Sequence, residues 1–128
     1  MNRRLPENPD PGPPPDAPDA PFRFDQLPRI LRENVARLGW EEPMPVQERV
    51  IPLLSAGRDL VVQSRTGSGK TGAFVLPMLM RVDPAQDRLQ ALILVPTREL
   101  AEQVHGVVRG LAEGTAVRSA AIYGGVAY

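Results

Sequence analysis

A glycine-rich octapeptide lies between two apolar stretches near the middle of the chain. It comprises Ser64, Arg65, Thr66, Gly67, Ser68, Gly69, Lys70 and Thr71. The apolar run 60–62 precedes it and the apolar segment 73–76 follows it, an order that predicts a strand, a tight turn and a helix. Backbone N–H groups in such a turn converge on one point, and the helix that follows adds the positive end of its dipole. The pattern therefore predicts a phosphate-binding loop.

The side chains of this loop suit a nucleotide that carries Mg²⁺. Gly67 and Gly69 leave no Cβ in the way of the phosphates. Lys70 is the only lysine in a chain whose other cationic side chains are arginines, and it is long enough to reach the β- and γ-phosphates. The Thr71 hydroxyl is placed to ligate Mg²⁺.

Ser64 departs from the general pattern of such loops, which has glycine at this position. Because a residue with a Cβ disfavours positive φ, the loop must begin in a conformation that such a residue accepts. A glycine-rich turn that only connects two core elements is the alternative interpretation of the whole stretch.

Composition restricts the classes of protein to which the chain can belong. Its 128 residues predict at most one compact domain, and the absence of cysteine excludes disulfides and thiolate metal sites. The formal net charge is zero, so any contact with nucleic acid must be local. The start at Arg3–Arg4 runs into prolines, and the apolar run 73–80 is too short to span a bilayer. We therefore expect a cytoplasmic protein with no membrane partner.

Residues 1–21 differ from the rest of the chain. They hold eight of the fifteen prolines and have almost no apolar content. Such a segment buries too little surface to offset the entropy of ordering it, so we expect a disordered Pro-rich tail. A ligand for a proline-recognition domain is the alternative, although no basic residue lies beside the run 13–15.

Apolar periodicity in residues 22–128 predicts alternating strands and helices. Helices are expected over 28–38 and 45–55, from 70 to near 81, and after Thr97, which is a plausible N-cap. Strands are expected over 59–63, 91–95 and 117–123. This order predicts an α/β fold with a parallel sheet and flanking helices, without an obvious second half.

Four stretches, 39–47, 64–71, 96–101 and 124–125, follow one another along the chain. In this order they resemble the Q motif, motif I, motif Ia and the GG motif of the DEAD-box ATP-dependent RNA helicases. The resemblance implies that residues 22–128 are the N-terminal part of the first RecA-like domain, a P-loop NTPase fold, in truncated form. A different P-loop helicase or a transporter ATPase is a weaker alternative.

The resemblance implies an ATP site. The amide of Gln47 would hydrogen-bond to the adenine edge, and Phe22 would stack on the adenine ring. Phe24 could stack there equally well, and the alternative for Phe22 is a role in the hydrophobic core alone. The glycine-rich loop would hold the phosphates of ATP and, through Thr71, its Mg²⁺. Met44 departs from the family, which commonly has a Thr or Ser there to cap the second helix.

The resemblance also implies contact with RNA. Residues Thr97, Arg98, Gly124 and Gly125 would touch the sugar–phosphate backbone of single-stranded or duplex RNA. A hydroxyl, a guanidinium and backbone N–H groups at a helix start all suit phosphates. Thr97 as a simple helix cap and Arg98 as a solvated charge are the alternatives. His105, the only histidine, is expected on the surface without chemistry.

Parts of the family's catalytic machinery are missing from these 128 residues. The sequence contains no Asp-Glu pair, no Ser-Ala-Thr motif and no second RecA-like domain with its arginine finger. The catalytic set is therefore incomplete, with contributions from Lys70 and Thr71 alone. We expect the chain to bind ATP and RNA but neither to hydrolyse ATP nor to unwind RNA until the C-terminal half and the second domain are present. A stand-alone, non-enzymatic nucleotide- or RNA-binding module is the alternative.

Overall fold

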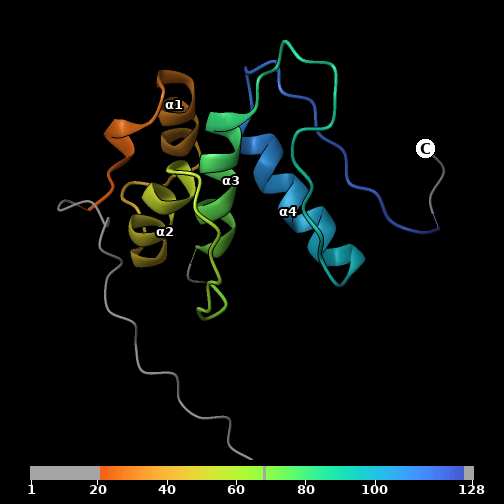
Figure 1. Ribbon diagram of the computed structural model, residues 1–128, viewed down its shortest axis with the longest axis horizontal. Helices are drawn as coiled ribbons and strands as arrows, with labels where there is room; N and C mark the ends of the chain where they lie inside the picture. Colours follow the sequence, from red (N-terminus) through yellow and green to blue (C-terminus); the bar gives the residue numbers. More distant parts are fainter. Residues whose placement is uncertain (1–20, 68, 126–128) are drawn as a thin grey trace, which may run out of the picture.

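The computed structural model describes residues 21–67 and 69–125, and these residues form helices joined by extended segments (Figure 1). The elements are the 3₁₀ turn η1 (Phe24–Gln26) and the helices α1 (Arg29–Arg37), α2 (Pro45–Ser55), α3 (Lys70–Arg81) and α4 (Arg98–Leu111). The expected disordered tail lies outside the described residues except for Pro21, and so does Ser68 of the glycine-rich loop.

The helices expected from apolar spacing are confirmed. Helix α2 has the expected bounds, and α1 begins one residue after Pro28, which is its N-cap and not its first helical residue. The Thr97 hydroxyl accepts a hydrogen bond from the Leu100 N–H at 3.2 Å, so Thr97 caps α4 as expected. Local signals were sufficient because each helix makes its backbone hydrogen bonds within its own segment.

The expected parallel sheet does not form among the described residues. The segments 59–63, 91–95 and 117–123 contain no strand, so the three strand predictions are wrong for this part of the chain. Residues 91–95 nevertheless show the exposure pattern of a strand, because their side chains alternate between half-buried and exposed. A strand exists only as part of a hydrogen-bonded ladder, and these segments do not pair with one another.

The hydrophobic core lies between the helices. Helix α3 packs against both α2 and α4, and α1 packs against α4 and η1. The largest fully buried side chains are Val35, Ile51, Val75, Leu76, Pro77 and Leu111. Helix α3 is therefore central, and α2 and α4 pack on it.

Polar side chains of α1 hold the C-terminal end of α4. The amide of Asn34, only 6% exposed, donates to the Leu111 carbonyl at 2.7 Å and to the Glu113 carbonyl at 2.8 Å. Arg37 donates to the Gly110 carbonyl at 2.8 Å and pairs with Glu113 at 2.8 Å. The last carbonyls of a helix have no partner within it, so these side chains satisfy them and dock α1 on α4.

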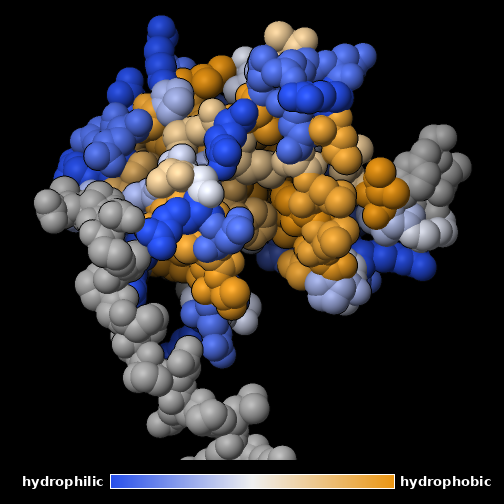
Figure 2. Space-filling view, viewed as in Figure 1, coloured by the Kyte–Doolittle hydropathy of each residue, from blue (hydrophilic) through white to orange (hydrophobic). Residues whose placement is uncertain are grey.

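Hydrophobic side chains form a surface patch over the segment that leads into α4 (Figure 2). Leu89, Leu92 and Leu94 are the large exposed side chains of this segment. No helix in the described part of the chain is both long and apolar enough to cross a membrane.

Candidate functional site

The glycine-rich loop leads into α3, as its sequence context predicted, although the segment before the loop is not a strand. Gly67 has φ +76° and Gly69 has φ +85°, which is the left-handed region that glycine adopts without strain. Gly69 is the N-cap of α3. Among the described residues only glycines have positive φ, so Ser64 enters the loop in a conformation that a side chain accepts.

Lys70 spans the loop from end to end. It is the first residue of α3, and its Nζ donates to the Ser64 carbonyl at 2.6 Å. An ammonium group hydrogen-bonds more strongly to an anionic oxygen than to a neutral carbonyl. A phosphate entering the loop therefore competes with Ser64 for Lys70. Arg65 and Thr66 are exposed in the same loop.

The structure brings the side chain of Gln47 to this loop. Its Oε1 accepts from the Met44 N–H at 3.0 Å, and its Nε2 donates to the Gly69 carbonyl at 3.2 Å. The first contact closes the N-terminus of α2 and the second ties α2 to the start of α3. Gln47 is only 3% exposed, so its predicted contact with adenine stays a prediction that requires the amide to become accessible.

Two glycines permit this close approach, one at the N-cap of α3 and one in its first turn. A Cβ on Gly69 would lie 2.7 Å from Gln47 Nε2 and 2.8 Å from Met44 Sδ. A Cβ on Gly72 would lie 2.7 Å from Gln47 Nε2 and 2.8 Å from Cζ3 of Trp40. Sequence reasoning missed Gly72. The available signal was a glycine inside a helix, where it costs about 1 kcal/mol relative to alanine and so needs a packing reason.

The structure buries Phe22 in the core. Phe22 is 7% exposed, and its ring meets that of Phe24 edge-on with 6.3 Å between centroids. Phe24 in turn lies 6.5 Å from the ring of Trp40. These contacts support the alternative in which Phe22 anchors the first helices, while stacking on adenine stays a prediction.

A bound Mg²⁺ would depend on few protein groups. The described ranges 21–67 and 69–125 contain no cluster of three or more His, Asp or Glu side chains that could hold a metal ion. Thr71, half-buried in the first turn of α3, is one residue after Lys70 and supplies a hydroxyl. Mg²⁺ commonly keeps several waters and binds through one or two protein groups plus substrate phosphates, so this donor set fits an ion that arrives with the nucleotide.

The residues predicted to contact RNA meet at the start of α4. Thr97 caps the helix, and Arg98 is its first residue. A Cβ on Gly125 would lie 3.3 Å from Arg98 Nη1, so motif Ia and the GG motif are in contact although these two residues lie 27 positions apart in sequence. Gly124 and Gly125 are exposed, as are Thr97 and Arg98. A guanidinium and free helix N–H groups on one exposed surface suit a phosphate.

His105 contributes to the attachment of the segment after α4. The side chain is half-buried on α4, and its Nε2 lies 3.1 Å from Ser119 Oγ. The Tyr123 hydroxyl donates to the carboxylate of Glu102 on the same helix. The sequence predicted a surface histidine without chemistry, and the structure adds that His105 helps to hold residues 117–123 on α4.

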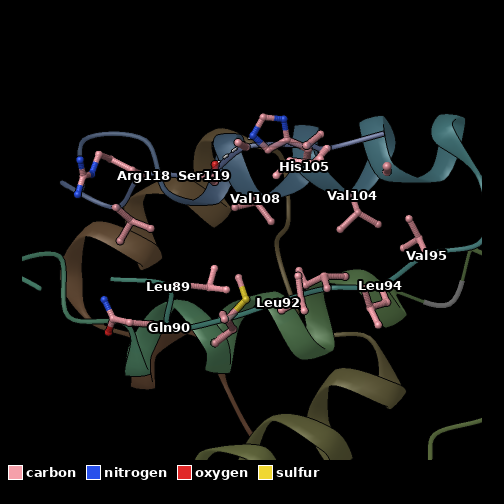
Figure 3. Close-up of a pocket in the computed structure, with 18 of the residues that line it drawn as sticks. Leu89, Gln90, Leu92, Leu94, Val95, Val104, His105, Val108, Arg118 and Ser119 are labelled. Atoms are coloured by element: carbon pink, nitrogen blue, oxygen red, sulfur yellow. Dashed lines mark hydrogen bonds between the residues drawn. The ribbon is translucent and has the colours of Figure 1, made fainter. Parts of the chain in front are cut away.

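A cavity lies away from the glycine-rich loop. It is a groove of about 720 Å³ between α4 and residues 88–95, with residues 116–123 along another wall (Figure 3). Val104 and Val108 of α4 face the residues of the opposite wall across it (Figure 3). This apolar groove is not part of the predicted nucleotide site.

A family model of the DEAD/DEAH box helicases matches residues 44–128. The chain belongs to this family. It is 48% identical over 93 residues to the ATP-dependent RNA helicase CshA of Listeria monocytogenes, covering 73% of this chain and 18% of that protein. It is 41% identical over 99 residues to the ATP-dependent RNA helicase me31b of Drosophila melanogaster, covering 77% of this chain and 22% of that protein.

Solved DEAD-box structures share the arrangement of this chain. A DEAD box protein of Methanococcus jannaschii has a TM-score of 0.79 and 36% identity, over 84% of this chain and 31% of that chain. Dbp5 of Saccharomyces cerevisiae, bound to RNA and ADP BeF3, has a TM-score of 0.70 and 39% identity, over 73% of this chain and 25% of that chain. The resemblance inferred from four motifs is therefore confirmed. The DEAD-box chain spans about a fifth of these curated relatives and less than a third of these solved chains.

Proposed function

We propose that this chain is the ATP- and RNA-binding segment of a DEAD-box ATP-dependent RNA helicase. The hydrogen bond from Gln47 Nε2 to the Gly69 carbonyl carries the proposal. It joins the Q motif to the phosphate loop through two residues that lie 22 positions apart in sequence, which supports a single site built from both motifs. Family membership supports the same function, since the relatives are named ATP-dependent RNA helicases.

In this proposal the loop and α3 bind the phosphates of ATP. Backbone N–H groups of the loop and the N-terminal end of α3 face the phosphates, and Lys70 turns from the Ser64 carbonyl toward the terminal phosphate. Thr71 ligates the Mg²⁺ that accompanies ATP, and that ion neutralises charge on the phosphates. Gln47 reads the adenine edge from the side of α2.

RNA binds at the start of α4. The Thr97 region, Arg98 and the glycine pair 124–125 offer N–H groups and one guanidinium to the sugar–phosphate backbone. Such contacts position a strand without reading its bases. The same surface therefore accepts single-stranded RNA or one strand of a duplex.

We propose further that these 128 residues alone neither hydrolyse ATP nor unwind RNA. Removal of an arginine finger costs ~10³–10⁵ in the rate of phosphoryl transfer where such a residue operates. The sequence has no Asp-Glu pair to orient the attacking water, and it spans less than a third of the matched solved chains. The remaining catalytic groups would come from a longer protein with a second RecA-like domain.

Titration with a fluorescent ADP analogue tests the nucleotide site. Lys70→Ala should remove most of the affinity, because it deletes the charge that faces the phosphates. Arg49→Ala is the matched control, since Arg49 is exposed on α2 and also carries one positive charge. Equal affinity for the wild-type protein and Lys70→Ala would exclude a phosphate-binding role for the loop. Loss of affinity in both variants would point to net charge instead of the loop.

A further inference from the structure

Met44 lies between the start of α2 and the glycine-rich loop. It is the N-cap of α2, and its N–H donates to Gln47 Oε1 at 3.0 Å. Its side chain reaches across to α3, because a Cβ on Gly69 would lie 2.8 Å from Met44 Sδ and 3.3 Å from Met44 Cβ. Helices α2 and α3 pack against each other (Figure 1). The thioether of Met44 therefore lies against the residue at which α3 begins.

Met44 is also accessible to solvent, with 39% of its surface exposed. The described residues contain two other methionines, Met78 and Met80 of α3, and both are partly buried against the core. The chain has no cysteine, so no thiol competes for an oxidant. Among these three methionines, an oxidant that approaches the folded protein therefore meets the sulfur of Met44 first.

A peroxide converts an accessible thioether into a sulfoxide. A sulfur lone pair attacks one oxygen of hydrogen peroxide, the O–O bond breaks as the S–O bond forms, and the second oxygen leaves as water after proton transfer. The sulfur loses an electron pair, and the peroxide is reduced by the same pair. Methionine sulfoxide reductases reverse the change, so the modification is reversible.

The new oxygen would alter the contact between Met44 and α3. A sulfoxide is a polar group, whereas the thioether that it replaces is only a weak acceptor. The first N–H groups of a helix have no partner within it, and Gly69, the N-cap of α3, has no side chain to accept from them. Met44 Sδ lies beside the position from which such a side chain would start. The sulfoxide oxygen is therefore placed to accept from N–H groups at the start of α3.

We propose that Met44 is a reversible oxidation site, and that its sulfoxide oxygen accepts from the first N–H groups of α3 and lowers the affinity of the glycine-rich loop for phosphate. The effect on phosphate rests on the proposed function, in which the same N–H groups face the phosphates of ATP. The two acceptors compete for these donors, and the negative end of the S–O dipole repels a phosphate. The reagent is a peroxide, and hydrogen peroxide is the probe.

Two measurements on the full 128-residue chain need no nucleotide. Peptide mass spectrometry after brief treatment with hydrogen peroxide should find the added oxygen on Met44 before Met78 and Met80. Amide hydrogen exchange at 70–72 should then be slower in the oxidised protein, because these amides have gained a hydrogen bond. Repair by methionine sulfoxide reductases should restore the original exchange rates. Faster oxidation of Met78 or Met80, or unchanged exchange at 70–72, would overturn the proposal.

Two variants assign the effect to one sulfur. Met44→Leu keeps an apolar side chain of similar volume that cannot be oxidised, so its exchange at 70–72 and its nucleotide affinity should be the same before and after peroxide. Met78→Leu is the matched control, and it should respond to peroxide as the wild-type protein does. A response that persists in Met44→Leu would overturn the proposal, because another group would then be responsible for it.

Titration with a fluorescent ADP analogue measures the effect on phosphate. Peroxide should weaken the affinity of the wild-type protein by about tenfold or more, which corresponds to one lost hydrogen bond to a charged ligand. Equal affinity of the oxidised and untreated proteins would overturn the proposal and leave the proposed function intact. No binding by the untreated protein would instead overturn the proposed function, whereas the oxidation and exchange results at Met44 would stand.

Discussion

The side-chain amide of Gln47 serves two backbone groups. Its oxygen accepts from the Met44 N–H, and its nitrogen donates to the Gly69 carbonyl. An amide has two donor hydrogens and two acceptor lone pairs, so one of each remains for a ligand. Binding of adenine and support of the phosphate loop by the same residue are therefore compatible once the amide is exposed. Selectivity for adenine and affinity for phosphate should then change together in Gln47 variants.

Competition of ATP and GTP against a fluorescent ADP analogue tests this role. The wild-type protein should favour ATP by ~1–3 kcal/mol, because guanine leaves polar groups of the site unpaired. Gln47→Ala should bring the two affinities together, whereas Gln103→Ala, an exposed glutamine of α4, should leave the preference intact. If GTP competes as well as ATP in the wild-type protein, Gln47 does not select adenine and only links the two helices structurally.

Arg98 gives a separate prediction at the scale of one residue. Arg98→Ala should weaken binding to poly-U and poly-A alike and lower the salt dependence by about one phosphate contact, because a backbone contact carries no base information. Filter binding at several salt concentrations measures both quantities. Arg109→Ala removes the same charge from the last turn of α4 and should have a smaller effect. A loss confined to one base composition would contradict recognition of the backbone.

At the scale of elements, the close contact between α2 and α3 depends on a glycine, which has no Cβ to separate the two helices. Gly72 lies inside α3 against Gln47 and Trp40, where an added Cβ would come within 2.7 Å and 2.8 Å of them. Gln47 is held by two hydrogen bonds and the indole of Trp40 is rigid, so neither neighbour can move without cost. Gly106 is also helical, in α4, yet a Cβ there would meet no atom within 4 Å.

Denaturant unfolding of Gly72→Ala and Gly106→Ala compares two positions of equal helix propensity. Gly106→Ala should raise the free energy of unfolding by up to about 1 kcal/mol, the propensity difference between the two residues. Gly72→Ala should lower it by about 1–3 kcal/mol, because overpacking outweighs that gain. Similar stabilisation by both substitutions would show that α2 and α3 do not approach closely at Gly72.

At the scale of the whole molecule, Asp83 lies too far from the glycine-rich loop to activate a water there. Asp83 follows the C-terminal end of α3, and the 12 residues of that helix separate it from the loop. At 1.5 Å per residue this distance is about 18 Å. Hydrogen bonds from Gln86 and from the Ala85 N–H lower the pKa of the Asp83 carboxyl from its ordinary value. Asp83 is therefore a local turn residue.

Phosphate release tests the proposed inactivity of the full 128-residue chain. We expect the wild-type protein to release phosphate from ATP no faster than Lys70→Ala, with or without RNA, because the sequence has neither an Asp-Glu pair to orient the attacking water nor a second domain whose arginine finger stabilises the developing charge. Turnover clearly above that variant, and stimulated by RNA, would contradict the proposed inactivity. Glu99, in the first turn of α4, would then be the carboxylate to substitute next.

The sequence by itself determined the helices and the family. Caps such as Thr97 and apolar spacing predicted α1 to α4, because helical hydrogen bonds join residues four apart. Four motifs predicted the family that the comparisons confirmed. The glycine-rich turn before α3 was predicted from its flanks for the same local reason.

Only the tertiary structure decided how distant segments meet. It brought Gln47 to Gly69, placed Arg98 beside Gly125 and buried Phe22 against Phe24. It also left 91–95 without a β partner among the residues that the structure describes, although the apolar run of this segment predicted a strand. A strand takes its hydrogen bonds from another segment, and a buried ring takes its contacts from other elements. Neither is specified by the residues that lie next to it along the chain.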